Sequence, residues 1–460
     1  MTMAGRVIGS DTAVPVLGGG TRRYVNLDHA ASTPPFAAVL RAVTEFSTWY
    51  ANVHRGTGFK SRLSSAAYDD ARRVVERFVG ADPAHDVAVF TRNTTEGLNH
   101  LAQRLVLPGG SVVISTLMEH HSNDLPWRRV ARVVHVGLDA AGAVDEDAMR
   151  AAFAEHRGSV ALLAVSGASN VTGIVNPVHR WARLAHDAGA RIVVDAAQLV
   201  PHREVSMRPA DDPEHLDFLA FSAHKMYAPF GTGVLVGPRA FFGSGEPRLS
   251  GGGTVDIVDV DRVVWTRAPD REEAGTPCIV GAVALAAAIA EYRRIGWTAI
   301  REHETALTRT ALAGLAAIPG VRVYGDADPA RAAERLGVIA FNFEGVPHAL
   351  ASAILSDEWG IGTRSGCFCA HPYVKALLGI GADASRALED RIVRGDRADV
   401  PGTVRASFGL SNAPDDADRL VAAVRSVAEG RYAVGYALDA SDGEWRHGGA
   451  CSTFDAYFTP

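Results

Sequence analysis

The chain has 460 residues, with 46 Lys or Arg against 52 Asp or Glu, so its formal net charge is −6. This length exceeds what one simple core organises and predicts two domains. The mild acidity gives no positive footprint for nucleic acid, and the apolar residues stand in runs too short to span a membrane, so we expect neither partner.

Cysteine usage and the start of the chain indicate the compartment. Four cysteines in a chain of this size do not make a disulfide framework. Residues 1–20 hold a single arginine and lack the apolar segment of a secretory signal. The simplest expectation is a reduced, cytoplasmic protein.

The first predicted elements are a strand at 24–27, which leads into a turn of small residues before Pro34, and a Gly-punctuated loop at 52–58. Residues 65–79 have apolar side chains at helical spacing and end at Gly80, which predicts a helix with a glycine after its last turn.

A strand at 87–90 then leads into a helix that begins near Thr94 and Thr95. The first turn of a helix has unpaired N–H groups and the positive end of the dipole, so hydroxyls placed there favour phosphate binding. Plain N-capping by Thr94 would give the same pattern in sequence.

The next strand, at 111–115, is followed by the adjacent histidines His120 and His121. An imidazole can stack on an aromatic ring and relay a proton near neutral pH, whereas a histidine pair could also lie in a solvated loop. Further strands at 132–138, 161–165 and 191–195 alternate with helices at 146–155 and 177–188. This alternation predicts a mostly parallel sheet with helices on both faces and polar motifs at its carboxyl edge.

Two of these strand ends carry charged side chains. Asp195 ends the strand at 191–195, and Lys225 stands between apolar strands at 216–221 and 233–236. A carboxylate at a buried strand end needs a partner, and a nucleophilic lysine needs a fixed, desolvating place. Pyridoxal phosphate explains both, because its aldehyde forms a Schiff base with lysine and its pyridinium nitrogen pairs with a carboxylate. Taken separately, Lys225 could be a surface lysine and Asp195 a helix cap.

The motifs Val194-Asp195-Ala196-Ala197-Gln198 and Ser222-Ala223-His224-Lys225 resemble those of class V, fold-type I pyridoxal phosphate enzymes, above all group II cysteine desulfurases. The resemblance runs from about residue 24 to about residue 430. It implies a large α/β domain over 22–270, with a mostly parallel seven-stranded sheet and helices on both faces. It also implies a smaller α+β domain over 271–435 on which residues 1–21 pack, and it leaves a tail at 436–460 with no assigned role.

The resemblance also implies roles for single residues. Thr276 would reach into the partner subunit's site to hold the phosphate, which implies a homodimer with two shared active sites. The substrate would be held by Arg405, on its α-carboxylate, together with Arg364 and Asn170; a lone arginine on a strand could instead make a structural salt bridge. The remaining residues implied to contact the cofactor are Thr94, Thr95, His120, Asn170, Asp195, Gln198, Ser222, His224 and Lys225.

A second reactive centre is predicted in the Gly-rich segment 360–372. A thiol beside cations in such a loop would be accessible and have a lowered pKa. In the family, an arginine stands five residues before the catalytic cysteine, as Arg364 stands before Cys369. Where this chain has Cys367 the family usually has histidine. The Cys-Phe-Cys pattern and the extra segment 374–402 resemble the desulfurase domain of molybdenum cofactor sulfurases.

Three other interpretations of these cysteines stay open. Cys367, Cys369 and His371 could be part of a metal site, although a structural zinc wants four ligands. Both thiols could be small buried hydrophobes, or Cys369 could be unused by the enzyme.

The resemblance implies a pyridoxal phosphate-dependent cysteine desulfurase. Lys225 would move the α-proton, Asp195 would keep the pyridine nitrogen protonated, and His120 would shuttle protons. Cys369 would take sulfur from L-cysteine as a persulfide, release L-alanine and pass the sulfur to an acceptor protein.

Two further functions are kept beside this one. A carbon-sulfur lyase would act by β-elimination on a cysteine conjugate or sulfoxide, without need of Cys369; a selenocysteine lyase is a variant of the desulfurase. A non-catalytic protein would only bind the cofactor.

Overall fold

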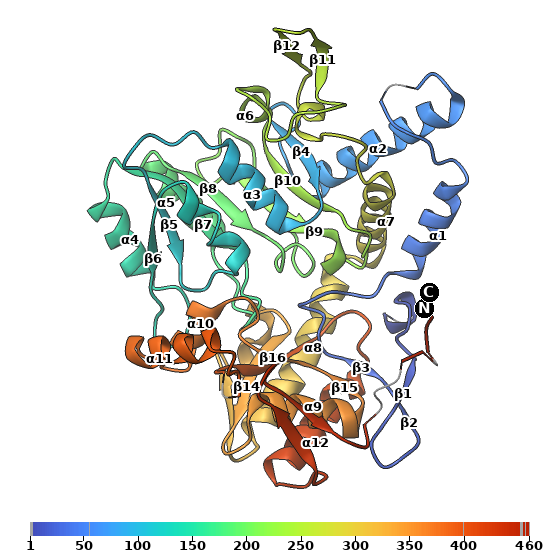
Figure 1. Ribbon diagram of the computed structural model, residues 1–460, viewed down its shortest axis with the longest axis vertical. Coiled ribbons are helices and arrows are strands. Elements are labelled where there is room, and N and C mark those ends of the chain that lie inside the picture. Colours follow the sequence, from blue (N-terminus) through green and yellow to red (C-terminus); the bar gives the residue numbers. More distant parts are fainter. Residues whose placement is uncertain (1–2, 55, 399, 451–453, 456, 460) are drawn as a thin grey trace.

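The computed structural model describes residues 3–54, 56–398, 400–450, 454–455 and 457–459, which form two units placed one above the other in Figure 1. The predicted seven-stranded sheet is confirmed in the first unit. Its strand order is β4 (Asp86–Thr91), β10 (Gly233–Pro238), β9 (Phe218–Ser222), β8 (Arg191–Asp195), β7 (Val160–Ser166), β5 (Val112–Thr116) and β6 (Arg132–Val136). The last five strands run parallel to one another, and β10 is antiparallel to both β9 and β4.

Helices cover both faces of this sheet, because successive strand residues point to opposite sides. Val194 belongs to one buried apolar cluster, together with Trp181 of α5, and Val193 to another, together with Leu98 of α3. The helices of this unit are α1 (Ala37–Ser47), α2 (Phe59–Phe78), α3 (Thr94–Arg104), α4 (Glu146–Glu155), α5 (Val178–Asp187) and α6 (Arg239–Gly243).

The second unit is built on a four-stranded antiparallel sheet with its own apolar core. Its strand order is β13 (Val321–Tyr324), β14 (Val338–Phe343), β17 (Thr403–Ser407) and β16 (Arg364–Gly366), and its main helices are α8 (Trp297–Ala316), α9 (His348–Trp359) and α12 (Pro414–Ala428). The N-terminal strand β3 (Val25–Asn26) pairs in parallel with β15 (Ile361–Gly362), so the start of the chain is tied to this unit. Before it stand β1 (Ala13–Pro15) and β2 (Thr21–Arg23), which pair with each other.

Helix α7 (Ile279–Ile295) follows the predicted boundary at residue 270 but packs against α1 and α2. Its Leu285 and Ile289 are fully buried in the apolar cluster on the large sheet. We therefore propose that the boundary between the units lies at the end of α7 and not at residue 270.

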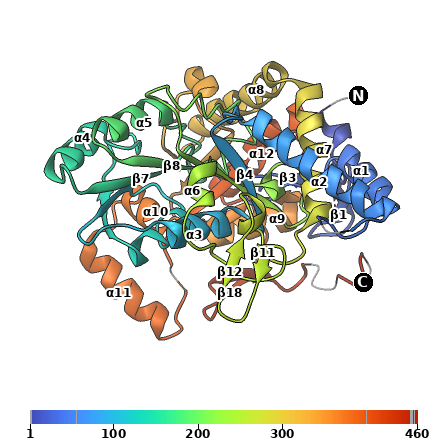
Figure 2. The same ribbon diagram turned by 90° about the horizontal axis from the view of Figure 1, so that it is seen from above.

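The segment predicted as an addition at 374–402 forms the end of α10 (His371–Leu377) and all of α11 (Ala382–Val393). Tyr373 docks α10 on the large unit, where its hydroxyl donates to the carbonyl of Gly142 at 2.8 Å. Helix α11 buries no side chain and projects from the body of the molecule (Figure 2).

Two hairpins stand at the surface. The first pairs β11 (Val255–Val258) with β12 (Val263–Trp265), and the second, in the predicted tail, pairs β18 (Tyr436–Asp439) with β19 (Glu444–His447). The hairpin of β11 and β12 exposes Ile257, Val258 and Val260. Among the described residues, no helix combines the length and the apolar character that crossing a bilayer demands.

Candidate active site

A cavity of about 340 Å³ opens at the carboxyl edge of the large sheet, where the two units meet. Ser166, Asp195 and Ser222 end the adjacent strands β7, β8 and β9 and all line it. The second unit contributes four residues, namely Arg364, Phe368, Cys369 and Arg405. Parallel strands thus bring to one edge the polar side chains that follow them in sequence.

Lys225 lies in the short turn Ala223–Lys225 that follows β9, and it lines the cavity. The turn is held from both sides, because Ala223 N donates to Thr232 O and Thr33 N donates to His224 O, each at 2.9 Å. Burial lowers the pKa of Lys225 to about 8, against the partial compensation of the Asp195 carboxylate. Lys225 is therefore not a solvated surface lysine. A much larger fraction of its amine is therefore neutral at pH 7 than in an ordinary lysine.

Asp195 is 5% exposed at the end of β8, and burial raises its pKa, while the Ala197 N–H and the Lys225 charge act in the other direction. Ala197 N donates to Asp195 Oδ1 at 3.0 Å, which fixes the carboxylate at the edge of the cavity. A desolvated carboxylate in such a place is stabilised by a cationic partner.

The N-terminus of α3 forms one end of the cavity. Its capping residue is Asn93, whose side chain accepts from Glu96 N at 2.9 Å, so N-capping by Thr94 is wrong. Thr94 N and its hydroxyl are both bonded to Ser222 Oγ, at 2.8 and 2.6 Å, while the exposed Thr95 hydroxyl meets Ser122 Oγ at 2.7 Å. All four of these hydroxyl-bearing residues line the cavity beside the positive end of the helix dipole, which is the environment that an anionic phosphate requires.

His120 lies in the cavity wall between β5 and the short helix that follows it. Its Nδ1 accepts from Ser122 N at 3.1 Å, so the ring proton is on Nε2. Burial lowers the pKa of His120 to about 3, and the positive charges of Lys225 and Arg405 act in the same direction, which keeps the ring neutral. Burial raises the pKa of the preceding residue, Glu119, to about 7. It does so although Glu119 accepts hydrogen bonds from Ser166, Thr116 and Asn123.

The N-terminal segment borders the cavity beside Gln198 and His224. Gln198 is buried, and its Nε2 donates to Ala30 O at 2.7 Å. His224 Nδ1 lies 3.3 Å from Ser32 Oγ, and burial beside Lys225 lowers its pKa to about 4. Ala30 and Ser32 of the N-terminal segment therefore lie against residues of the cavity.

Arg364 and Arg405 face each other across β16 and β17, and both bind the carboxylate of Asp28. Arg405 Nη2 to Asp28 Oδ1 is 2.7 Å, and Arg364 Nη2 to Asp28 Oδ2 is 2.9 Å. Two like charges on opposite strands repel each other, so this shared carboxylate stabilises the pair. Arg405 does make the structural ion pair that the sequence left open, and it lines the cavity as well.

Arg405 is further held by Asn170 and Phe368. Arg405 Nη1 donates to Asn170 O at 3.0 Å, and Asn170 Nδ2 donates to Phe368 O at 2.8 Å. The guanidinium carbon lies 4.7 Å from the centre of the Phe368 ring, a cation–π distance. The planar fork is thereby fixed in one orientation at the cavity wall.

Cys369 is exposed and lines the cavity at the turn after β16. Phe368 and Cys369 both have left-handed backbones, with φ of 51° and 56°, which non-glycine residues adopt at a cost of about 1–3 kcal/mol. The turn is held by His121 N, which donates to Cys369 O at 2.7 Å. His121 also stacks on His371, so this second histidine supports the loop while His120 lines the cavity.

Cys367 is buried and does not line the cavity. Its thiol donates to Pro401 O at 3.0 Å, and burial raises its pKa to about 11. The interpretation as a small buried hydrophobe therefore fits Cys367 and does not fit the exposed Cys369. Within the described residues, metal-ligating side chains converge only at His186, His215 and Asp217, and Cys367, Cys369 and His371 are not among them.

Thr276 lies apart from the other predicted site residues. It is exposed and lines a different cavity, beside Glu96 and Arg248. The structure therefore brings together in one cavity all the predicted residues except Thr276. Sequence reasoning missed Asp28, Ser122, Ser166 and Phe368; the first of these directly follows the predicted strand at 24–27, and a carboxylate at a strand end is the signal that could have found it.

A mostly parallel sheet that presents a desolvated lysine, a buried carboxylate and a helix N-terminus to one cavity defines the chain as an α/β enzyme. The profile of the aminotransferase class-V family matches residues 25–420, and the chain belongs to this family.

Named relatives are similar over most of their length. The chain is 35% identical over 415 residues to a probable cysteine desulfurase of Halalkalibacterium halodurans, covering 88% of this chain and 93% of the relative. It is 36% identical over 411 residues to a cysteine desulfurase of Dickeya dadantii, covering 87% and 91%. The apo structure of a cysteine desulfurase from Thermococcus onnurineus NA1 matches with a TM-score of 0.77 and 33% identity, over 88% of this chain and 95% of that one.

Proposed function

We propose that this protein is a pyridoxal phosphate-dependent cysteine desulfurase that transfers sulfur from L-cysteine to Cys369 and releases L-alanine. The observation that carries the proposal is that an accessible thiol and a desolvated lysine line the same cavity, although 144 residues separate them in sequence. The similarity to proteins named cysteine desulfurase supports it.

The cavity residues fit this cofactor. The hydroxyls of Thr94, Thr95 and Ser222 with the N-terminus of α3 would hold the phosphate. The neutral amine of Lys225 would bond the aldehyde carbon, and the buried carboxylate of Asp195 would pair with the ring nitrogen. His120 would lie on the ring. Pyridoxal phosphate, when bound, supplies a protonated ring that draws electrons from the α-carbon of an amino acid.

The protein's own residues then position the substrate and move its protons. The fixed guanidinium of Arg405 binds the α-carboxylate, with Asn170 beside it, in competition with Asp28. Lys225 takes the α-proton on Nζ, which its lowered pKa makes an effective base near neutral pH. His120, which lines the cavity with its ring proton on Nε2, would relay a proton to the carbon that loses sulfur and would recover one from the Lys225 ammonium, which took up the α-proton.

Cys369 carries out the transfer. Its thiolate Sγ attacks the sulfur of L-cysteine, so that an S–S bond forms and the C–S bond breaks. The carbon keeps the electron pair of that bond and takes up a proton. In total, L-cysteine and a thiol become L-alanine and a persulfide, with no outside oxidant. The exposure of Cys369 would leave the persulfide accessible to a sulfur-acceptor protein.

The first prediction concerns the products. The holoenzyme with L-cysteine and a reducing thiol is expected to form alanine and sulfide in equal amounts, with pyruvate below about a tenth of the alanine. Amino-acid chromatography with a lactate dehydrogenase assay for pyruvate measures both. Pyruvate and ammonia as main products would instead establish a lyase, and a lack of any turnover would leave the non-catalytic alternative.

The second prediction concerns a homodimer with shared sites, which we propose from the placement of Thr276. The exposed apolar hairpin of β11 and β12 precedes Thr276 and suits a partner subunit's surface. Replacing Thr276 by alanine is expected to weaken cofactor binding about tenfold, the value of one hydrogen bond to a charged group.

Mixed dimers decide whether Thr276 acts across the interface. Subunits with Lys225→Ala are combined with subunits with Thr276→Ala. If Thr276 serves the partner's site, the one site with an intact Lys225 regains wild-type cofactor affinity. Weak binding in the mixed dimer, or a monomer in sedimentation equilibrium, would contradict the proposal.

A further inference from the structure

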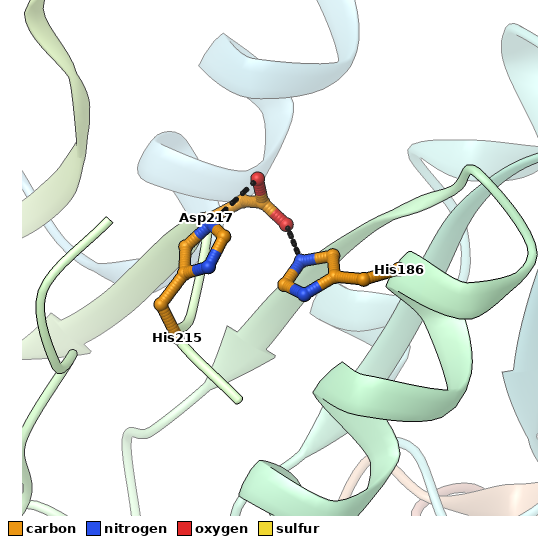
Figure 3. A group of neighbouring side chains, drawn as sticks. All are labelled: His186, His215 and Asp217. Atoms are coloured by element: carbon orange, nitrogen blue, oxygen red, sulfur yellow. Dashed lines mark hydrogen bonds and ion pairs between the residues drawn. The ribbon is translucent and has the colours of Figure 1, made fainter. Parts of the chain in front are cut away.

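Three side chains converge at the edge of the large sheet opposite to the active-site cavity. His186 lies in the last turn of α5, and His215 and Asp217 lie in the segment that leads into β9 (Figure 3). A ring nitrogen of each histidine and a carboxylate oxygen all lie within 4.8 Å of one another. The cluster lies at the start of β9, and the turn of Lys225 follows the end of this strand. The cluster and the turn are therefore roughly 17 Å or more apart, the length of the strand.

The hydrogen bonds of the two histidines fix which nitrogen faces the cluster. His186 Nδ1 lies 2.9 Å from Pro213 O, and His215 Nδ1 lies 2.8 Å from Asp212 O. A carbonyl oxygen only accepts, so each ring has its proton on Nδ1. Nε2 of each ring therefore faces the Asp217 carboxylate, and in the neutral form its lone pair is available to an ion there. Metal-binding histidines are oriented through a backbone carbonyl in the same way.

The carboxylate is oriented in the same way. Ile192 N donates to Asp217 Oδ2 at 2.8 Å, which fixes the Asp217 side chain. His186 Nε2 lies 2.9 Å from Asp217 Oδ2, and His215 Nε2 lies 3.5 Å from Asp217 Oδ1. Ligands of a tetrahedral zinc ion, at about 2.0–2.1 Å from the metal, are about 3.3 Å apart, so side-chain shifts of a few tenths of an ångström would replace the 2.9 Å hydrogen bond by one shared ion.

A cation also resolves the electrostatics of the cluster. Without an ion, the hydrogen bonds to Asp217 raise the pKa of His186 and of His215, so protons on Nε2 compensate the carboxylate. Two protonated rings that stack with their centres 4.3 Å apart repel each other, and an ion bound in place of these protons removes that repulsion. One divalent ion satisfies both nitrogens and the carboxylate at once.

We propose that His186, His215 and Asp217 form a binding site for one divalent transition-metal ion, zinc above all. Two imidazole nitrogens and a carboxylate oxygen are a donor set that zinc takes with a water in the fourth position. The histidine side chains are 19% exposed and that of Asp217 12%, which leaves a route for the ion and room for the water.

The place of the site indicates a structural role. An ion here would join the end of α5 to the start of β9, and through Asp217 and Ile192 to the start of β8. These strands end in Asp195 and the turn of Lys225 at the other edge. The ion would therefore stabilise the fold without touching the reacting atoms.

The test measures zinc binding by the chelator-treated holoenzyme and three variants. His186→Gln and Asp217→Asn each remove one ligand. His179→Gln is the matched control, because His179 also lies on α5 and its Nδ1 meets Glu214 O at 2.9 Å, outside the cluster. All four proteins keep the active-site thiol, so zinc bound there contributes equally to each.

Wild type and His179→Gln are expected to bind one zinc per chain more than the other two variants. At free zinc 100-fold above the dissociation constant, their thermal midpoint should rise by about 3 °C, a rise absent in His186→Gln and Asp217→Asn. Cobalt(II) should give visible absorption bands of a tetrahedral site in the first pair only. The asparagine in Asp217→Asn keeps an oxygen that can accept the hydrogen bond of Ile192 N, so this variant is expected to fold. If His186→Gln does not fold, the zinc content of Asp217→Asn alone tests the proposal.

Equal zinc per chain and an equal thermal shift in all four proteins would overturn the proposal. So would a wild type that takes up no zinc beyond that at its thiol.

Discussion

Replacement of Cys369 by serine is expected to abolish alanine formation from L-cysteine, with a loss of about 1,000-fold or more. Serine keeps the size and the left-handed turn but offers a hydroxyl, which is far less ionised and less nucleophilic toward sulfur than a thiol. Chromatography of alanine from wild type and variant measures the loss, and the absorbance of the bound cofactor shows that the site is otherwise intact.

Cys367→Ser is the matched control for this variant. Cys367 is two residues away, and its thiol donates to Pro401 O outside the cavity. A serine hydroxyl can make the same hydrogen bond, so activity should stay within about threefold of wild type. Full activity in Cys369→Ser, or a large loss in Cys367→Ser alone, would refute the assignment of the nucleophile.

Replacement of Lys225 by alanine is expected to reduce turnover about 10,000-fold, because the proton-transfer base is lost. The variant should also fail to attach the cofactor covalently. The chain has only three lysines, Lys60, Lys225 and Lys375, so borohydride reduction of the loaded wild type should label a single peptide, the one with Lys225.

The pH dependence of labelling follows from the same group. Only the neutral amine reacts, and burial lowers the pKa of Lys225 to about 8, so the rate of cofactor uptake should rise with pH and level off above about pH 8. Lys375→Arg is the control, because Lys375 pairs with Glu389 away from the cavity. Label on the Lys375 peptide, or uptake that still rises steeply from pH 9 to 10, would contradict this environment for Lys225.

The order of elements and the motifs at strand ends could be predicted from the sequence because these are local properties. Buried strands that alternate with helices predicted the mostly parallel sheet, and parallel strands necessarily bring their carboxyl ends to one edge. For this reason the sequence predicted that Asp195 and Lys225 lie close together, and both line the cavity in the structure. The spacing from Arg364 to Cys369 identified the loop of the exposed thiol for the same reason, since a short segment determines it.

The tertiary structure alone decided which groups from distant segments meet. Asp28 binds Arg405 across 377 positions of sequence, and no local pattern contains that pairing. The same holds for α7, whose apolar residues indicate burial but not the sheet against which they pack. Side chains of His186 and His215, 29 positions apart on a helix and a loop, stack only because α5 folds back along β8. Sequence determines the local elements and their polar ends, whereas partners depend on the packing of the whole chain, because burial and charge compensation act through space.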